Sequence, residues 1–325
     1  MSFTYDVWKP YHLFFSAPFS QKYLYNQYNS SSIVDAEQRS FKNCYPFIYY
    51  LEHSKNYYQT ALKSHTSMQP VLLFYGLSQL LKACLLTKNP VYPENTAVLA
   101  HGVSTRKRKK QSYDFLDDEV KIQKNGLFSE VGKELFHMKQ LEGQKYTMTE
   151  LLIHIDEMYS LFNELSPSRA SKKVLVGNLN NKELIFPNQI KESYHMDNTR
   201  LHLYLQDRFK IDMRMQEINP TLRISFANLH TNLYQCSPLL FNLETSDLHL
   251  TTSREQCVYF PEILSHYLIL YNLSMISRYE TEWWYELLHT YSSKDYPYIM
   301  HFLQLTSIKA PYLLFNYLQS QIKKD

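Results

Sequence analysis

Glycine is scarce in this chain, with 6 residues among 325. Loops that cradle phosphate groups and the turns of doubly wound nucleotide-binding sheets depend on clustered glycines. Neither the pattern GxxxxGK followed by Ser or Thr nor the pattern GxGxxG occurs in the sequence. The sequence therefore excludes these two nucleotide-binding classes, although it leaves other ways of binding a nucleotide open.

Cysteine is also sparse, and the 4 cysteines stand far apart at Cys44, Cys84, Cys236 and Cys257. Because no CxxC pair exists, the sequence predicts neither a cysteine zinc site nor a disulfide framework. This usage is typical of a reducing cytosol. The N-terminal segment has an acidic residue before its first lysine and a proline in its middle, which is not the pattern of a signal peptide. We therefore expect a cytoplasmic location.

The motifs of common catalytic and metal centres are missing as well. The sequence contains neither HExxH nor GxSxG. His154 and His195 each stand two residues before an aspartate, but a metal ion needs three or four ligands. Arg223 and His230 have the spacing used by helical HEPN ribonucleases. About one such match is expected by chance in a chain of this composition, and the segment is predicted to be a strand, whereas the motif belongs on a helix. We expect no cofactor, no metal and no catalytic residues, and we disfavour ribonuclease activity.

Basic and acidic residues nearly balance, with 34 Lys and Arg against 31 Asp and Glu and a net charge of +3. A nucleic-acid binder needs a dominant basic face, so we do not expect nucleic-acid binding. One run of cations departs from this balance and comprises Arg106, Lys107, Arg108, Lys109 and Lys110. Either this run is a solvated loop that nearby carboxylates neutralise, or it contacts an anionic group or an acidic partner surface, which suits the arginine fork.

Apolar residues make up 44% of the chain, which is enough for a sizeable core. The most apolar stretch, Val71–Leu86, directly follows Pro70, and proline is favoured at the first position of a helix. Gln79 and Lys82 lie three positions apart and share one narrow stripe, so we expect a helix buried on nearly every other side. The stretch is shorter than the roughly 20 apolar residues of a membrane span and contains a lysine, which favours a core helix.

The remaining chain reads as α+β, predominantly α, with three parts. Residues 1–166 form a helical part that carries the basic run, with helices expected over 16–28, 36–63 and 148–165. Residues 167–260 form a small antiparallel β region. Residues 261–325 form C-terminal helices that pack back on the first part, so we expect the three parts to form one compact unit.

Three local features sharpen this prediction. Asn125-Gly126 is a strong turn signal and predicts the tip of a small β-hairpin or hooked loop. The segment RLHLYL at 200–205 alternates apolar and polar residues, which predicts a strand. Pro311 predicts an interruption of the last helix.

Four residues are candidates for a ligand pocket: Lys82, His101, Arg278 and Trp283. We expect the pocket between the apolar helix and the helix that ends near Arg278, with His101 placed between the apolar helix and the basic run. Structural roles are the alternative. Lys82 is then a lysine at the edge of the core, and Arg278 pairs with a nearby carboxylate while it stacks on Tyr279 or Trp283.

The segments 44–59 (CYPFIYYLEHSKNYYQ), 69–128 and 262–284 carry a resemblance to a known family. On these segments, and over nearly its whole length, the chain resembles the YaaC family of Firmicutes proteins. The resemblance supplies no catalytic residues. The N-terminal helices of the family are similar to HEPN-type helical pairs. Genes of the family commonly lie beside the gene for IMP dehydrogenase. The resemblance therefore implies a role that touches purine nucleotide synthesis, through contact with that enzyme.

Two hypotheses of different classes follow. We expect a non-catalytic interaction or regulatory protein that contacts a protein partner, such as IMP dehydrogenase, through the basic run. The alternative is a nucleotide-binding protein or enzyme with a pocket at Lys82, His101 and Arg278. The sequence leaves the oligomeric state open.

Overall fold

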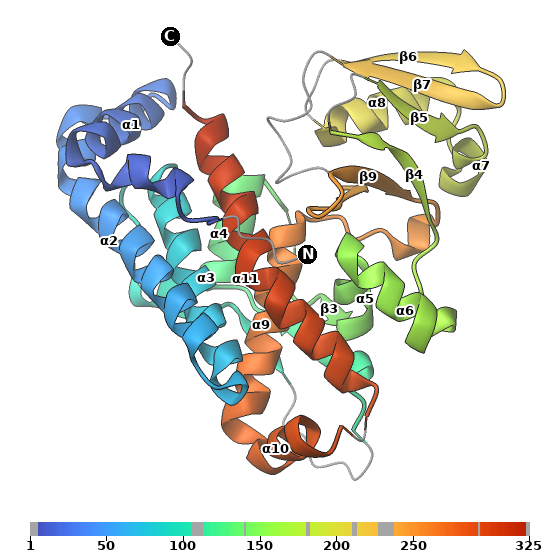
Figure 1. Cartoon of the computed structure of the whole chain (residues 1–325). Coiled ribbons are helices and arrows are strands. Elements are labelled where there is room, and N and C mark those ends of the chain that lie inside the picture. Colours follow the sequence, from blue (N-terminus) through green and yellow to red (C-terminus); the bar gives the residue numbers. More distant parts are fainter. Residues whose placement is uncertain are drawn as a thin grey trace. The chain divides into compact units, whose positions relative to one another are not determined.

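The computed structural model describes residues 6–105, 113–139, 141–179, 183–209, 213–226, 237–291 and 293–322. Its fold is α+β and predominantly helical (Figure 1), which confirms the fold class predicted from the sequence. The chain divides into two compact units. Unit 1 comprises Met1–Met148 and His266–Asp325, and unit 2 comprises Thr149–Ser265.

Long helices form most of unit 1 (Figure 1). In chain order they are α1 (Ala17–Ser30), α2 (Ala36–Lys63), α3 (Gln69–Leu86), α4 (Leu127–Phe136), most of α9 (Glu262–Tyr279), α10 (Thr281–Thr290) and α11 (Asp295–Ser320). The short 3-10 helices are η1 (Pro10–Phe15), η2 (Thr66–Met68), η3 (Thr96–Leu99) and η4 (Phe115–Asp117). A small antiparallel sheet of order β1-β2-β3 contains β1 (Val103–Thr105), β2 (Glu119–Ile122) and β3 (Lys145–Thr147). The helices predicted before residue 90 are therefore confirmed.

The close packing of α2 on α3 depends on Gly76. A Cβ atom at this position would lie 2.7 Å from Cδ2 of the fully buried Tyr58. The hydroxyl of Ser54 on α2 donates a hydrogen bond of 2.7 Å to the carbonyl of Gly76. The missing side chain thus lets the two helix backbones approach each other.

Helix α3 is the core helix that the sequence predicts. Its buried side chains include Leu73, Leu77, Leu80 and Leu81, each at most 1% exposed. By length and composition the segment Thr66–Leu86 could also cross a membrane, but 67% of its most apolar window is buried within the protein. Burial on most sides is what the apolar circumference of this helix requires.

One sequence prediction in unit 1 is wrong, and one of two alternatives is excluded. The chain does turn at Asn125-Gly126, but the pair does not form the tip of a β-hairpin, because Gly126 is the N-cap of α4 and has a φ of 126°. The chain leaves β2 and enters a helix rather than a second strand. Pro311 does not interrupt the last helix either, since it lies inside the continuous helix α11.

Unit 2 combines two small antiparallel sheets with short helices. One sheet has the order β4-β9-β8 and the other the order β5-β7-β6. The strands are β4 (Lys173–Asn178), β5 (Glu183–Pro187), β6 (Met213–Ile218), β7 (Thr221–Phe226), β8 (Leu239–Phe241) and β9 (Asp247–Thr251). The helical elements are α5 (Met148–Ile153), η5 (Asp156–Met158), α6 (Tyr159–Leu165), η6 (Pro167–Arg169), α7 (Ile190–Tyr194), α8 (Asn198–Phe209) and η8 (Arg254–Gln256).

The strand predicted for RLHLYL is wrong, because these residues lie in α8. Leu201 and Leu205 are spaced four apart and are each 1% exposed, so they form one buried helical face. The Asp197 carboxylate accepts a hydrogen bond of 2.8 Å from the amide of Arg200, which caps the first turn. The cap at Asp197 and the buried pair Leu201 and Leu205 favour a helix more strongly than the alternating pattern favours a strand.

The single helix predicted over 148–165 is also wrong. The segment consists of α5, η5 and α6, and the break comes at Ile155, whose backbone is extended. The break sets Asp156 at the start of a new turn.

Candidate functional site

Helix α3 presents one half-exposed row of side chains within unit 1. The row includes Tyr75, Gln79 and Lys82, at spacings of four and three residues that keep them on one helix face. Rings from α2 adjoin the row. The ring of Tyr57 stacks on that of Tyr75 with centroids 6.0 Å apart, and Lys82 Nζ lies 6.0 Å from the centre of the Tyr50 ring.

His101 lies beside this row because its backbone is fixed by two hydrogen bonds. Its carbonyl accepts one from the Phe128 amide at 3.2 Å and one from the Tyr267 hydroxyl at 2.9 Å. Its ring centroid lies 6.1 Å from that of Tyr75 and 5.8 Å from that of Tyr271. The imidazole is thus surrounded by aromatic rings from two helices.

Two of the basic residues predicted as pocket candidates act electrostatically on the third, His101. Burial, followed by the positive charges of Arg278 and Lys82, lowers the pKa of His101. Burial also lowers the pKa of Lys82. The neutral imidazole is therefore favoured beside two cations, and a negative charge placed among them would reverse this preference.

Neither cation has an acidic partner among the residues that the structure describes. Arg278 Nε donates to the Ser274 carbonyl at 2.9 Å, and its guanidinium lies 5.3 Å from the centre of the Tyr279 ring. Lys82 makes no ion pair within the described part of the chain. Half-buried charges are usually paired, so two unpaired cations that both act on His101 are a functional signal.

Two polar atoms nearby lack hydrogen-bond partners. The side-chain oxygen of Gln79 and the hydroxyl of Tyr92 are both buried and unbonded. Tyr92 is only 6% exposed, and burial, together with the nearby Tyr50 and Glu130, raises the pKa of its hydroxyl. Unbonded buried polar groups are rare, which is why a missing ligand is a reasonable explanation for them.

We name the set Tyr50, Tyr75, Gln79, Lys82, His101 and Arg278 the aromatic–cationic site. Lys82, His101 and Arg278 were predicted as candidates from the sequence. The two tyrosines and Gln79 were not, although the helical spacing of Tyr75, Gln79 and Lys82 on α3 was a signal that could have found two of them.

Trp283 contacts a different set of residues. Its ring lies edge-on to Tyr113 with centroids 4.7 Å apart and stacks beside Trp284. Within the described part of the chain it has no ring or polar contact with Lys82, His101 or Arg278. The predicted basic run Arg106, Lys107, Arg108, Lys109 and Lys110 lies outside the described residues.

Comparison with known proteins gives one match. No curated protein and no solved structure is significantly similar to the chain. A family profile with the description YaaC-like Protein matches residues 12–318, which is nearly the whole chain. The match covers both units and every residue of the aromatic–cationic site. The chain belongs to the YaaC-like family.

Proposed function

We propose that this protein binds a small anionic ligand with an aromatic ring, of the nucleotide class, at the aromatic–cationic site. The observation that carries the proposal is the pair of half-buried cations, Lys82 and Arg278, which lack a described acidic partner and both act electrostatically on His101. Lysine and arginine are the usual partners of a phosphate group. Tyrosine rings give a base a surface on which to stack.

The base of such a ligand would also find hydrogen-bond partners at this site. The unbonded oxygen of Gln79 accepts hydrogen bonds, which suits an exocyclic amino group or a ring N–H of a base. The Tyr92 hydroxyl both donates and accepts. A ligand that satisfied both groups would remove the cost of burying them unbonded.

Binding without turnover agrees with the regulatory role expected from the sequence. A regulatory protein of this kind responds to a ligand because the ligand binds one of the protein's two conformational states more tightly than the other. Contact with IMP dehydrogenase, or with another protein partner, stays a prediction, because no described feature bears on it.

The direct test is a panel of purine and pyrimidine nucleotides, with binding measured by calorimetry and thermal shift. At a ligand concentration 100 times the Kd, binding is expected to stabilise the protein by about 2.7 kcal/mol. Lys82→Met and Arg278→Ala are each expected to weaken binding by about 10- to 100-fold, since each removes a charge-assisted contact. Lys63→Met is the matched control, because Lys63 is exposed in the last turn of α2.

Circular dichroism would confirm that the variants keep the helical content of the wild type. If no nucleotide changes the melting temperature, or if Lys82→Met binds as tightly as Lys63→Met, the proposal fails.

The affinity is also expected to depend on pH through His101. Its pKa is lowered in the free protein, so the imidazole is neutral at pH 7. A bound anion favours the charged imidazole and raises this pKa, so binding takes up a proton. The affinity therefore rises as the pH falls from the pKa of His101 in the complex toward its lower pKa in the free protein, by up to about tenfold for each unit by which binding raises the pKa.

Calorimetry in two buffers of different ionisation enthalpy would measure this proton uptake. Because the ligand's own phosphate also titrates, the wild type is compared with His101→Asn under the same conditions. The variant is expected to lose the part of the pH dependence that belongs to the protein. Identical profiles for both proteins would show that His101 does not sense the ligand.

A further inference from the structure

Helix α2 of unit 1 carries a row of exposed aromatic side chains. Phe41 is 69% exposed, Tyr45 is 55% exposed and Tyr49 is 60% exposed. Their spacing of four residues places them along one side of the helix, and the ring centroids of Tyr45 and Tyr49 lie 6.0 Å apart. We name Phe41, Tyr45 and Tyr49 the aromatic row.

The aromatic row is not part of the core of unit 1. The buried side of α2 faces other elements, since the ring centroid of Phe47 lies 6.0 Å from that of Tyr23 on α1, and Tyr58 packs on Gly76 of α3. At 3.6 residues per turn, the aromatic row lies on the side of α2 away from these contacts. Neighbouring rings that are each more than half exposed form an apolar patch, which is typical of an interaction surface.

The aromatic row and the charges beside it are symmetric about the level of residue 47 in α2. Tyr45 and Tyr49 lie two residues before and after this level. Lys42 and Glu52 lie five residues before and after it, and both are exposed. All four side chains lie within about 40° of one common direction around the helix. Neither charge forms an ion pair or hydrogen bond with a described residue, so both are available to a partner.

This symmetry is what an interface between two copies of the chain requires. In a two-fold symmetric interface, residue i of one copy meets residue j of the other, and j meets i. Two α2 helices packed antiparallel about the level of residue 47 bring Lys42 opposite Glu52 of the partner subunit, and Tyr45 opposite the partner's Tyr49, at two equivalent places. Packed helices lie about 8–10 Å apart, which lets these long side chains meet. Parallel packing in register would instead bring like charges together.

The area of the aromatic row is sufficient for a small dimer interface. A buried aromatic side chain contributes roughly 150–250 Å², so the exposed parts of the six rings in two copies supply roughly 500–1,000 Å². The exposed side chains of Gln38, Lys42, Glu52 and Asn56 adjoin the row. Their burial brings the total to the roughly 1,200 Å² at which stable interfaces begin. An interface of this size favours a Kd in the micromolar range.

We propose that the protein forms a two-fold symmetric homodimer through α2, in which the aromatic rows of two copies pack antiparallel and Lys42 pairs with Glu52 of the partner subunit. A second copy is favoured over an unrelated partner, because an unrelated partner would not require opposite charges at equal distances from one level of the helix. The proposal does not depend on nucleotide binding, and it is tested without nucleotide.

Sedimentation equilibrium of the full chain measures the dimerisation. The chain has a mass of 38.8 kDa, and the wild type is expected to approach twice this mass as its concentration rises from about 1 to about 100 µM. Tyr49→Ser is expected to weaken dimerisation about 100-fold, because each dimer loses two buried rings. Since Tyr49 is exposed, the variant is expected to keep the circular dichroism spectrum of the wild type.

Charge reversal tests the pairing itself. Lys42→Glu and Glu52→Lys are each expected to weaken dimerisation about tenfold or more at low salt, because each places like charges opposite each other at two contacts. Lys124→Glu is the matched control, since Lys124 is exposed in unit 1 but lies outside α2. An equimolar mixture of Lys42→Glu and Glu52→Lys, at a concentration where each alone is monomeric, is expected to form a heterodimer, because opposite charges then face each other at both contacts.

Four results would overturn the proposal. The first three are a wild type that stays monomeric at about 100 µM, equal dimerisation of Lys42→Glu and Lys124→Glu, and a mixture of the two single variants that forms no heterodimer. The fourth is a monomer that sediments with phosphatidylglycerol vesicles and loses this binding in Tyr49→Ser, which would show that the aromatic row docks on a membrane surface.

Discussion

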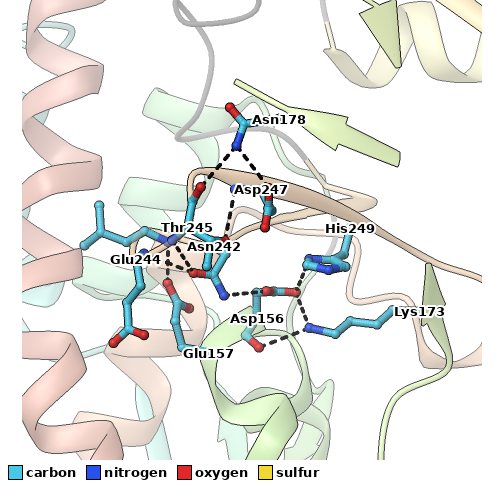
Figure 2. Close-up of polar contacts among 10 residues, drawn as sticks. Asp156, Glu157, Lys173, Asn178, Asn242, Glu244, Thr245, Asp247 and His249 are labelled. Carbon is cyan, nitrogen blue, oxygen red and sulfur yellow. Dashed lines mark hydrogen bonds and ion pairs between the residues drawn. The ribbon is translucent and has the colours of Figure 1, made fainter. Parts of the chain in front are cut away.

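Replacement of Asp156 by asparagine is expected to lower the free energy of unfolding of unit 2 by about 3–5 kcal/mol, the usual effect of breaking a buried ion pair from one side. The variant keeps the shape of the side chain but leaves the charge of Lys173 without its partner (Figure 2). Lys173 is only 5% exposed, so water cannot take the place of the carboxylate. Its remaining described interactions are with the Asp156 backbone carbonyl, the Tyr159 ring and the negative charge of Glu157.

Hydrogen exchange measured on peptides from residues 149–265 is the suitable readout, because the chain has two units and one global transition cannot be assumed. The double variant Asp156→Asn with Lys173→Met is the control. It removes both charges and is expected to recover most of the lost protection. If the amides of unit 2 are as well protected from hydrogen exchange in Asp156→Asn as in the wild type, the ion pair does not stabilise unit 2.

The same pair predicts the acid stability of unit 2. Burial alone would raise the pKa of Asp156, but His249, Lys173 and Asn242 together lower it to about 2. Because the folded-state pKa lies below the unfolded value of 3.8, the stabilisation is complete above that value and is lost as the pH falls toward 2. The double variant is expected to lack this acid-dependent loss of protection.

The helical core was predictable from the sequence because its signals are local. The apolar circumference of α3 and the position of Pro70 are enough to define that helix. Where two local signals compete, the prediction from the sequence was wrong. In α8 the alternation of RLHLYL indicates a strand, whereas the cap at Asp197 and the burial of Leu201 and Leu205 decide for a helix.

The candidate site and the buried ion pair of unit 2 show where sequence reasoning ends. Lys82 and His101 stand out because a lysine in an apolar helix and a histidine beside a glycine are unusual in their own segments. The ion pair has no such signal. Asp156 attracts attention only as half of a His-x-Asp pair, whereas its partners Lys173 and Asn242 are 17 and 86 positions away. Only the pairing of β4 and β8 with β9 brings these residues together.

The largest effect in unit 1 is expected at Gly126. A Cβ atom at this position would lie 2.4 Å from the Gly102 nitrogen and 2.7 Å from the Ala100 carbonyl oxygen. These are backbone atoms, so they cannot rotate away as a side-chain tip can. The residue also has a φ of 126°, which L-residues rarely adopt. Gly126→Ala is therefore expected to lower the free energy of unfolding by about 3 kcal/mol or more, from strain and overlap together.

Gly143 provides the matched control for this prediction. Its φ of 81° is also positive, but no heavy atom lies within 4 Å of the Cβ that alanine would add. Gly143→Ala is therefore expected to cost only the backbone strain, about 1–2 kcal/mol. Hydrogen exchange measured on peptides of unit 1 in the two variants separates strain from overlap, and equal losses of protection would contradict the overlap.

The steric overlap caused by Gly126→Ala is also expected to affect the aromatic–cationic site. The amide of Leu127 donates to the Ala100 carbonyl at 2.7 Å, and the amide of Phe128 donates to the His101 carbonyl at 3.2 Å. Any shift of α4 that relieves the overlap lengthens these bonds and moves the imidazole. Gly126→Ala is thus expected to weaken nucleotide binding as well as stability, whereas Gly143→Ala changes stability alone. This difference would show that the first turn of α4 positions His101 for its ligand.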